Sequence, residues 1–308
     1  KQSRLVTDII SEHAPIYEKA SIDEHYIDIT GMDRFFGSFR WSKQLRERII
    51  KDTGLPISFG LSTNKTVSKI ATGEGKPNGE LHIPQQDIKP FLSPLSIRKI
   101  PMIGKQSYRL LRSMGVSTIR TLSMIPPEMI SQVMGKNGII AWKKANGIDD
   151  TPVVQYSERK SISTERTFDK DTTNIIYLNN LLTSMVEKIA FELRKKQKLT
   201  GCVTVKIRYS NFDTHTLQKH LTYTSFDHIL IQTATELFNR LYTRRMLIRL
   251  IGVRFSSLVG GSQQLDIFED KPEMIDLYQA MDNMRLRYGN KAVQRAIGID
   301  VNNKGKNI

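Results

Sequence analysis

The chain has 308 residues, of which 39% are hydrophobic and 25% are charged, and its net charge is +15. This composition is typical of a soluble globular protein, and no apolar run reaches the length of a membrane span. The length favours two or three domains. No signal peptide opens the sequence, and the single cysteine, Cys202, lies in an alternating run. We therefore expect a cytoplasmic protein with a buried thiol in a strand.

The positive charge is concentrated in the middle of the chain. Residues 1–84 hold 12 basic and 11 acidic side chains, whereas residues 85–152 hold 10 and 4. Residues 153–258 hold 17 and 9, and residues 259–308 hold 7 of each. A solvated surface needs no such segregation. A polyanion that contacts both middle segments would favour it, and nucleic acid is the usual candidate.

Helices and strands alternate over the first 84 residues. Apolar spacing predicts a helix over residues 1–13 and a second one over residues 41–50, which Gly54 ends. The run Ser62-Thr63-Asn64 supplies cap residues for a third helix that breaks at Gly73 and Gly75. Short apolar runs predict strands over residues 20–29, 55–61 and 80–83. This order favours a mixed α/β or α+β layer that contains the strand of residues 20–29.

Two adjacent carboxylates, Asp23 and Glu24, lie in the first of these strands, and Asp28 follows closely. A buried or half-buried carboxylate is costly unless it is paired, hydrogen-bonded or bound to a metal, so this group indicates a divalent cation. Because neighbouring strand residues point to opposite faces, the two carboxylates converge on one ion only if a bend or hairpin lies here. The alternative is an acidic hairpin tip in water.

Residues 85–150 change character and predict short helices with many breaks. The run from Ile100 to Lys105 contains Gly104, and the periodic Tyr108 and Leu111 follow it, which indicates helix, hairpin and helix. A hairpin that opens a helix points backbone N–H groups outward at the positive end of the helix dipole, where a phosphate binds well. A plain helical turn with a glycine cap is the alternative.

Residues 153–258 predict the order β-α-β-β-α-β, which is that of a ferredoxin-like unit. The expected strands cover residues 158–168, 202–209, 214–223 and 246–258, and the expected helices cover residues 175–199 and 229–242. Such a unit has one open sheet face. Basic and hydroxyl side chains suited to duplex phosphates are spread over its strands: Lys160, Ser161, Ser163, Lys206, Arg208, Arg249 and Arg254. An ordinary solvated sheet face is the alternative.

A flexible linker at residues 259–262 leads to a short segment, residues 263–270, that places apolar and acidic residues side by side. Such a segment can bury its apolar side chains only in the groove of a partner or on its own domain. One more helix is predicted over residues 273–297, before a polar tail.

Several motifs now occur together and in order: SIDE from Ser21, GLSTNK from Gly60, SKIATGEGKPNG from Ser68, IPMIGK from Ile100 and KSISTERTF from Lys160. In this arrangement the chain resembles the Y-family DNA polymerases, and most closely the bacterial branch of translesion enzymes. The resemblance implies an α+β protein with a partial palm (a mixed sheet with helices) at residues 1–84 and a small helical thumb with a helix-hairpin-helix motif at 85–152. A ferredoxin-like little finger follows at 153–258, then a linker, a clamp-binding motif and a C-terminal helix at 259–308.

The resemblance also implies roles for single residues. Asp23 would bind two catalytic Mg²⁺ ions, and Glu24 would bind the one that activates the primer hydroxyl. Lys76 would lie against the triphosphate of an incoming deoxynucleotide. Gly104 and Lys105 would hold primer phosphates, and the basic and hydroxyl residues of the little finger would hold the template backbone of primer-template DNA. A sliding clamp would bind the QLDIF motif, of which we single out Gln264, Leu265, Ile267 and Phe268. The implied protein is a monomer without membrane contacts.

Two departures from the family pattern affect these expectations. The family begins with another metal-binding Asp and a fingers domain with a steric-gate aromatic, both before the position that matches Lys1 here. We therefore expect these residues alone to bind DNA but to be catalytically incomplete. Met102 stands where the thumb hairpin commonly has glycine, which makes that phosphate contact less secure. The alternatives are a DNA- and clamp-binding module without catalysis, and a helix-hairpin-helix nuclease.

Overall fold

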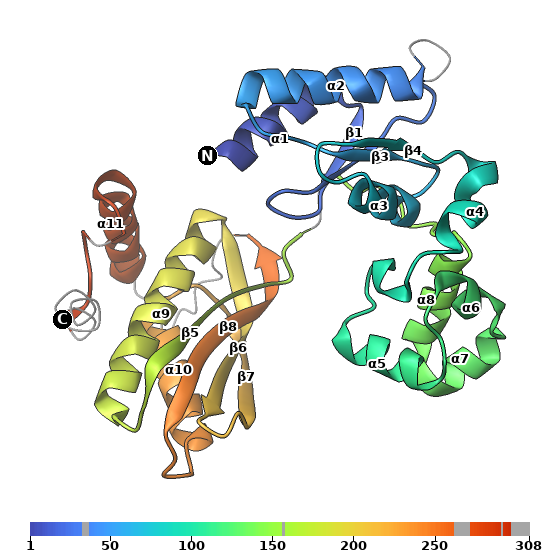
Figure 1. Cartoon of the computed structure of the whole chain (residues 1–308). Helices are drawn as coiled ribbons and strands as arrows, with labels where there is room; N and C mark the ends of the chain where they lie inside the picture. The colour runs from blue at the N-terminus through green and yellow to red at the C-terminus, as the bar shows by residue number, and fades with distance from the viewer. Residues whose placement is uncertain (33–36, 156–157, 262–271, 291, 297–308) are drawn as a thin grey trace. The chain divides into compact units, whose positions relative to one another are not determined.

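The computed structural model describes residues 1–32, 37–155, 158–261, 272–290 and 292–296 (Figure 1). The chain divides into two compact units, residues 1–157 and residues 158–308. Throughout the described ranges, no helix is long and apolar enough to cross a membrane.

Two helices and a hairpin open the first unit. Helices α1 (Gln2–His13) and α2 (Ser38–Thr53) bury Ile10 and Ile49 in a shared apolar core. Strands β1 (Ile16–Lys19) and β2 (His25–Asp28) pair antiparallel, and Lys19 lies opposite His25. Residues 20–24 are thus the tip of a hairpin, and the strand predicted over residues 20–29 begins only at His25.

A second, parallel pair of strands follows, with a helix between them. Strand β3 (Phe59–Leu61) pairs with β4 (Glu80–His82), and α3 (Lys65–Glu74) connects them. Of the three residues predicted to supply the cap, Asn64 caps α3, because its side chain accepts a hydrogen bond from the Val67 N–H. The expectation of one mixed sheet is wrong for the described part of this unit. Because β2 pairs only with β1, and β3 only with β4, two separate two-stranded sheets form.

Short helices make up residues 85–145, as expected. They are the 3₁₀ turns η1 (Gln85–Asp87) and η2 (Ile97–Lys99) and the helices α4 (Ile88–Leu92), α5 (Lys105–Ser113), α6 (Ile119–Met124), α7 (Pro127–Met134) and α8 (Lys136–Ala145). One apolar core extends from Val67 on α3 through Leu111 to Ala141, so these helices pack on the preceding α/β elements.

The second unit has the element order β-α-β-β-α-β. Its elements are β5 (Ser161–Thr172), α9 (Ile175–Lys195), β6 (Lys198–Tyr209), β7 (Thr214–Thr224), α10 (Asp227–Leu241) and β8 (Ile248–Gly260). They form one antiparallel sheet in the order β5-β8-β6-β7, with β8 and β6 at its centre (Figure 1). Each helix therefore connects two strands that have one other strand between them.

The two faces of this sheet differ in chemistry. Val203, Val205 and Phe255 point to the face that α9 and α10 cover, and all three are buried in a large apolar core. The residues next to them along each strand point to the opposite face, because strand side chains alternate. Cys202 is one of these and is free and 2% exposed, which confirms the buried strand thiol.

Helix α11 (Pro272–Tyr288) packs against the second unit through polar and aromatic contacts. Arg194 on α9 bonds to Asp282 on α11 at 2.6 Å and to Asp227 on α10 at 2.6 Å. The Tyr278 hydroxyl lies 2.9 Å from Nδ1 of His228. The helix predicted over residues 273–297 thus ends earlier, at Tyr288.

Candidate active site and nucleic-acid interface

The β1–β2 hairpin positions Asp23 and Glu24. The N–H groups of Ala20 and Ser21 both donate to the carbonyl of Glu24, at 3.0 and 3.2 Å, which closes a tight tip. Ser21 Oγ donates to Asp23 Oδ1 at 2.7 Å. The Ser3 hydroxyl on α1 donates to the Ile22 carbonyl and ties the tip to that helix. The bend that two adjacent carboxylates need to share an ion is present.

Two lysines bring positive charge to this tip. Lys69 Nζ on α3 lies 2.5 Å from Glu24 Oε2, and this hydrogen bond raises the pKa of the Lys69 ammonium group. The Ser21 hydroxyl lowers the pKa of the exposed Asp23 carboxyl, and the charges of Lys76 and Lys69 act in the same direction. The Asp23 carboxyl is therefore held in its ionised form, as cation binding requires.

The tip fits part of a binding site for a hard divalent cation. Asp23 and Glu24 offer the carboxylate oxygens that Mg²⁺ prefers, and the Lys69 ammonium shows that the tip attracts positive charge. Asp28 is not brought in, because its Oδ1 accepts from the hydroxyl and the N–H of Thr30 at 2.6 and 2.9 Å. Among the residues with described positions, no three acidic, His or Cys side chains gather closely enough for a metal site.

A tight turn at residues 76–79 fixes the backbone of Lys76. Gly79 is required there, because a Cβ atom would lie 1.9 Å from the Gly75 carbonyl oxygen. Arg46 on α2 holds the turn from the other side, since its Nη2 donates to the carbonyl and side-chain oxygens of Asn78 at 2.8 and 2.7 Å. Arg46 also bonds to Glu80 at 2.7 Å. The positive charge of Lys76 lowers the pKa of the Asp23 carboxyl, and the nucleotide-binding role of Lys76 stays a prediction.

In the helical segment, Gly104 is the N-cap residue of α5 and Lys105 is its first residue. A Cβ atom on Gly104 would meet nothing within 4 Å, so the surface here is open. Met102 has a positive φ of 83°, a conformation that favours glycine, and its side chain is 63% exposed. The methionine is thus accommodated by pointing outward, beside the backbone that was predicted to hold a phosphate.

The strand register brings five of the predicted DNA-binding residues to one face of the second unit's sheet. Adjacent strands align Ser163 with Arg254, and Ser161 and the basic side chains of β6 project from the same face: Ser161, Ser163, Lys206, Arg208 and Arg254. Lys206 Nζ pairs with Glu165 at 3.0 Å, across Gly252 of β8. Arg254 is exposed and is not bonded to any described residue.

Models of known families match two parts of the chain. The impB/mucB/samB family matches residues 1–73, and the C-terminal domain of the same family matches residues 159–267. DNA polymerase IV of Dehalococcoides mccartyi strain BAV1 is 37% identical over 289 residues, which cover 93% of this chain and 74% of the relative. DNA polymerase IV of Desulfatibacillum aliphaticivorans is 33% identical over 301 residues, 96% of this chain and 76% of the relative. The chain belongs to the DNA polymerase IV family, a branch of the Y family.

Solved structures of Y-family polymerases share the fold. A Y-family polymerase chimera of Dbh and Dpo4 has a TM-score of 0.72 at 23% identity, and the match covers 84% of this chain and 76% of that one. A ternary complex of Dbh DNA polymerase matches with a TM-score of 0.57 at 22% identity, over the same shares of the two chains. The family membership makes this protein a DNA-directed DNA polymerase, and the mixed α+β fold agrees with it.

Two of the predicted DNA-binding residues, Lys160 and Arg249, do not join the five on the sheet face. Lys160 precedes β5 and is exposed. Arg249 lies at an irregularity of β8, where it pairs with Asp171 at 3.8 Å and lies over the Phe212 ring at 4.8 Å. The clamp-binding candidates lie outside the described residues: Gln264, Leu265, Ile267 and Phe268.

Sequence reasoning missed Lys69 and Arg46. Lys69 follows Lys65 by one helical turn on α3, so the helix predicted from Asn64 could have placed both lysines on one face. Arg46 carries no comparable signal, because its partners are far away in the sequence.

Proposed function

We propose that this polymerase copies primer-template DNA past damaged bases by nucleotidyl transfer at the tip of the β1–β2 hairpin. The observation that supports this role most directly is the electrostatic effect of Lys76 on Asp23, because Lys76 and the adjacent pair Asp23 and Glu24 come from two separate motifs. The family membership supplies the reaction type, and the ternary complex among the structural relatives supports binding of DNA and nucleotide.

In this proposal the residues at the tip and around it have different roles. Asp23 and Glu24 hold Mg²⁺, which neutralises phosphate charge and lowers the pKa of the attacking hydroxyl when it is bound. Lys76 places positive charge beside the triphosphate, where negative charge develops. Lys69 neutralises Glu24 while the tip holds no ion, so the two carboxylates do not repel each other.

The open sheet face and the Gly104 hairpin would hold the DNA. The side chains on the sheet face are basic or carry hydroxyl groups, which suit phosphate contacts that carry no sequence information. We also propose a role for the residues that the strand register does not bring to this face: Lys160 and Arg249 would contact the template at its margin. The sliding clamp would bind the QLDIF motif, and the protein would act as a monomer in the cytoplasm.

We infer that these 308 residues extend a primer slowly or not at all. Two carboxylates gather at the tip among the described residues, and phosphoryl-transfer sites rely on the bound ions for most of their charge stabilisation. Primer extension with Mg²⁺ and all four deoxynucleotides tests this inference, with the D23N/E24Q variant as the background. Robust synthesis that D23N/E24Q abolishes would support the active site and overturn the inactivity.

The second candidate is a DNA- and clamp-binding module without catalysis. The Lys69–Glu24 pair favours it, because the pair can satisfy Glu24 without any metal. Mn²⁺ binding separates the candidates, since a module whose acidic pair has lost its function binds no ion at the tip. Cleavage of the DNA in the primer-extension assay would instead favour the nuclease.

A further inference from the structure

The N-terminus of α3 holds a segment that lies far from it in the sequence. Asn64 Nδ2 donates to the Gly147 carbonyl at 2.9 Å, and the Thr66 hydroxyl donates to Asp149 Oδ2 at 2.5 Å. Lys65 Nζ donates to the Pro152 carbonyl at 3.1 Å. Three consecutive residues, all within or next to the GLSTNK motif, thus bind the stretch that leads out of α8.

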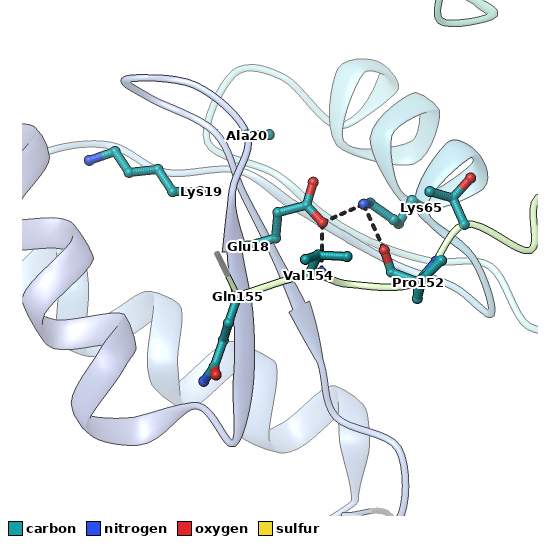
Figure 2. Close-up of a pocket in the computed structure, with 8 residues that line it drawn as sticks. Glu18, Lys19, Ala20, Lys65, Pro152, Val154 and Gln155 are labelled. Carbon is teal, nitrogen blue, oxygen red and sulfur yellow. Dashed lines mark hydrogen bonds and ion pairs between the residues drawn. The ribbon is translucent and has the colours of Figure 1, made fainter. Parts of the chain in front are cut away.

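Glu18 completes this set of contacts from β1, as Figure 2 shows. Its Oε2 accepts from Lys65 Nζ at 2.6 Å and from the Val154 N–H at 2.9 Å. The side chains of Lys65 and Glu18 are only 14% and 25% exposed. Burial raises the pKa of the Glu18 carboxyl, but the bonds from Lys65 and Val154 outweigh it and lower that pKa overall. One carboxylate oxygen therefore joins α3, the hairpin and the segment at residues 147–154.

The same helix reaches the catalytic tip one turn further on. Lys65 and Lys69 are four residues apart and lie on one face of α3. Lys65 bonds to Glu18 in strand β1 of the hairpin, and Lys69 bonds to Glu24 at the tip. Lys65 also lies 4.9 Å from the centre of the Tyr26 ring, on the strand opposite Glu18.

We propose that Glu18 and Lys65 are positioning residues, which latch residues 147–154 onto strand β1 close to the hairpin tip and so hold the tip that carries Asp23 and Glu24. We call this set of contacts the latch. Each bond involves a charged group with little exposure, and such bonds contribute more to local stability than exposed ion pairs do. The metal-binding role of the tip rests on the proposed function, but the latch itself can be measured without metal, DNA or activity.

Amide hydrogen exchange of the full chain tests the latch. The K65A variant should exchange the Val154 amide about tenfold faster or more, because a charge-assisted bond to a little-exposed group is lost. The amides of Ala20 and Ser21, which close the tip, should also exchange severalfold faster. K65R keeps a donor for Glu18 and should restore slow exchange at both places. K51A removes an exposed lysine from α2 and should change neither.

Two results would overturn the proposal. One is unchanged exchange at Val154 in K65A, and the other is faster exchange at Val154 with an unchanged tip. Slow exchange in the core of α7 shows that the unit remains folded. If K65A does not fold, E18Q keeps the shape of the side chain while removing its charge, and it must show the same two increases. If the wild-type protein binds no Mn²⁺ while K65A still shows both increases in exchange, the proposed function is contradicted and the latch is not.

Discussion

Lys69 Nζ lies 2.5 Å from Glu24 Oε2, with the two side chains 38% and 45% exposed. An ion pair with this exposure contributes about 0–1 kcal/mol, so a divalent cation can displace it at small cost. The ammonium group occupies a position beside the carboxylate that a metal ion would need. The Glu24 carboxylate therefore already has a positively charged partner before any metal ion binds.

Replacing Lys69 by Gln should strengthen metal binding at the tip. The substitution removes a competing positive charge from Glu24, and we expect the Kd for Mn²⁺ to fall by about two- to fivefold, the scale of an exposed ion pair. Electron paramagnetic resonance of free Mn²⁺ measures this Kd, and K51Q is the matched control. Weaker binding in K69Q would mean that Lys69 helps to orient Glu24 in the bound state.

The D23N/E24Q variant should lose Mn²⁺ binding and keep its stability. Asp23 is exposed and Glu24 makes only the exposed pair with Lys69, so we expect the free energy of unfolding to change by less than about 1 kcal/mol. Mn²⁺ titration and urea unfolding measure the two quantities. Unchanged Mn²⁺ affinity would place any metal site elsewhere in the chain.

DNA affinity should depend strongly on salt and on Arg254. If about 6–10 phosphates are contacted, affinity falls by about 10³–10⁵ between low and moderate salt. In a plot of the logarithm of the binding constant against the logarithm of the salt concentration, R254A should reduce the magnitude of the slope by about 1, because one phosphate contact is lost. R240A removes an exposed arginine from α10, which covers the opposite face of the sheet, and should have no effect. Equal losses in both variants would contradict binding on the open face.

Replacing Leu265, Ile267 and Phe268 together by Ala should abolish binding of the sliding clamp. DNA affinity should stay unchanged, since the residues proposed to hold DNA lie on other elements. Surface plasmon resonance on immobilised clamp and fluorescence anisotropy with duplex DNA measure the two affinities. Loss of both would indicate that the segment has a structural role in the fold.

Replacing Arg46 by Ala should destabilise the first unit. Arg46 is 12% exposed and bonds to Ile57, Asn78 and Glu80, so its loss removes the donor for two part-buried acceptors, the Ile57 carbonyl and the Glu80 carboxylate. We expect a loss of about 2–4 kcal/mol in unfolding free energy. R48A, whose side chain is 57% exposed, should cost less than about 0.5 kcal/mol. Thermal unfolding measures both, and equal Tm values in the two variants would contradict this role.

Local patterns predicted most of the elements, because their signals lie within a few residues of one another. Asn64 caps α3 and Gly54 ends α2 with a φ of 71°, as their types indicate. In the second unit the alternation along β6 placed Cys202 in a buried strand. The hairpin was harder to predict from the sequence, because β1 is four residues long and carries few apolar side chains.

The sequence could not reveal contacts between distant residues. Glu18 and Val154 are 136 positions apart, and no periodicity links a strand residue to a segment after the last helix of its unit. Arg249 carried the right charge for the sheet face, but the irregular register of β8 turns it toward Asp171. Charge and spacing therefore suggest which residues bind a polyanion, and only strand pairing decides which of them share a surface.

The burial of Cys202 makes the protein convenient for site-specific labelling. The chain has one cysteine, and its thiol is 2% exposed in the central strand β6. Maleimide dyes react with accessible thiolates, so the native protein should remain unlabelled under gentle conditions. A cysteine introduced at Lys51 in the first unit and another at Arg240 in the second can then carry a donor and an acceptor fluorophore. Their energy transfer would report whether the distance between these two positions changes when DNA is added.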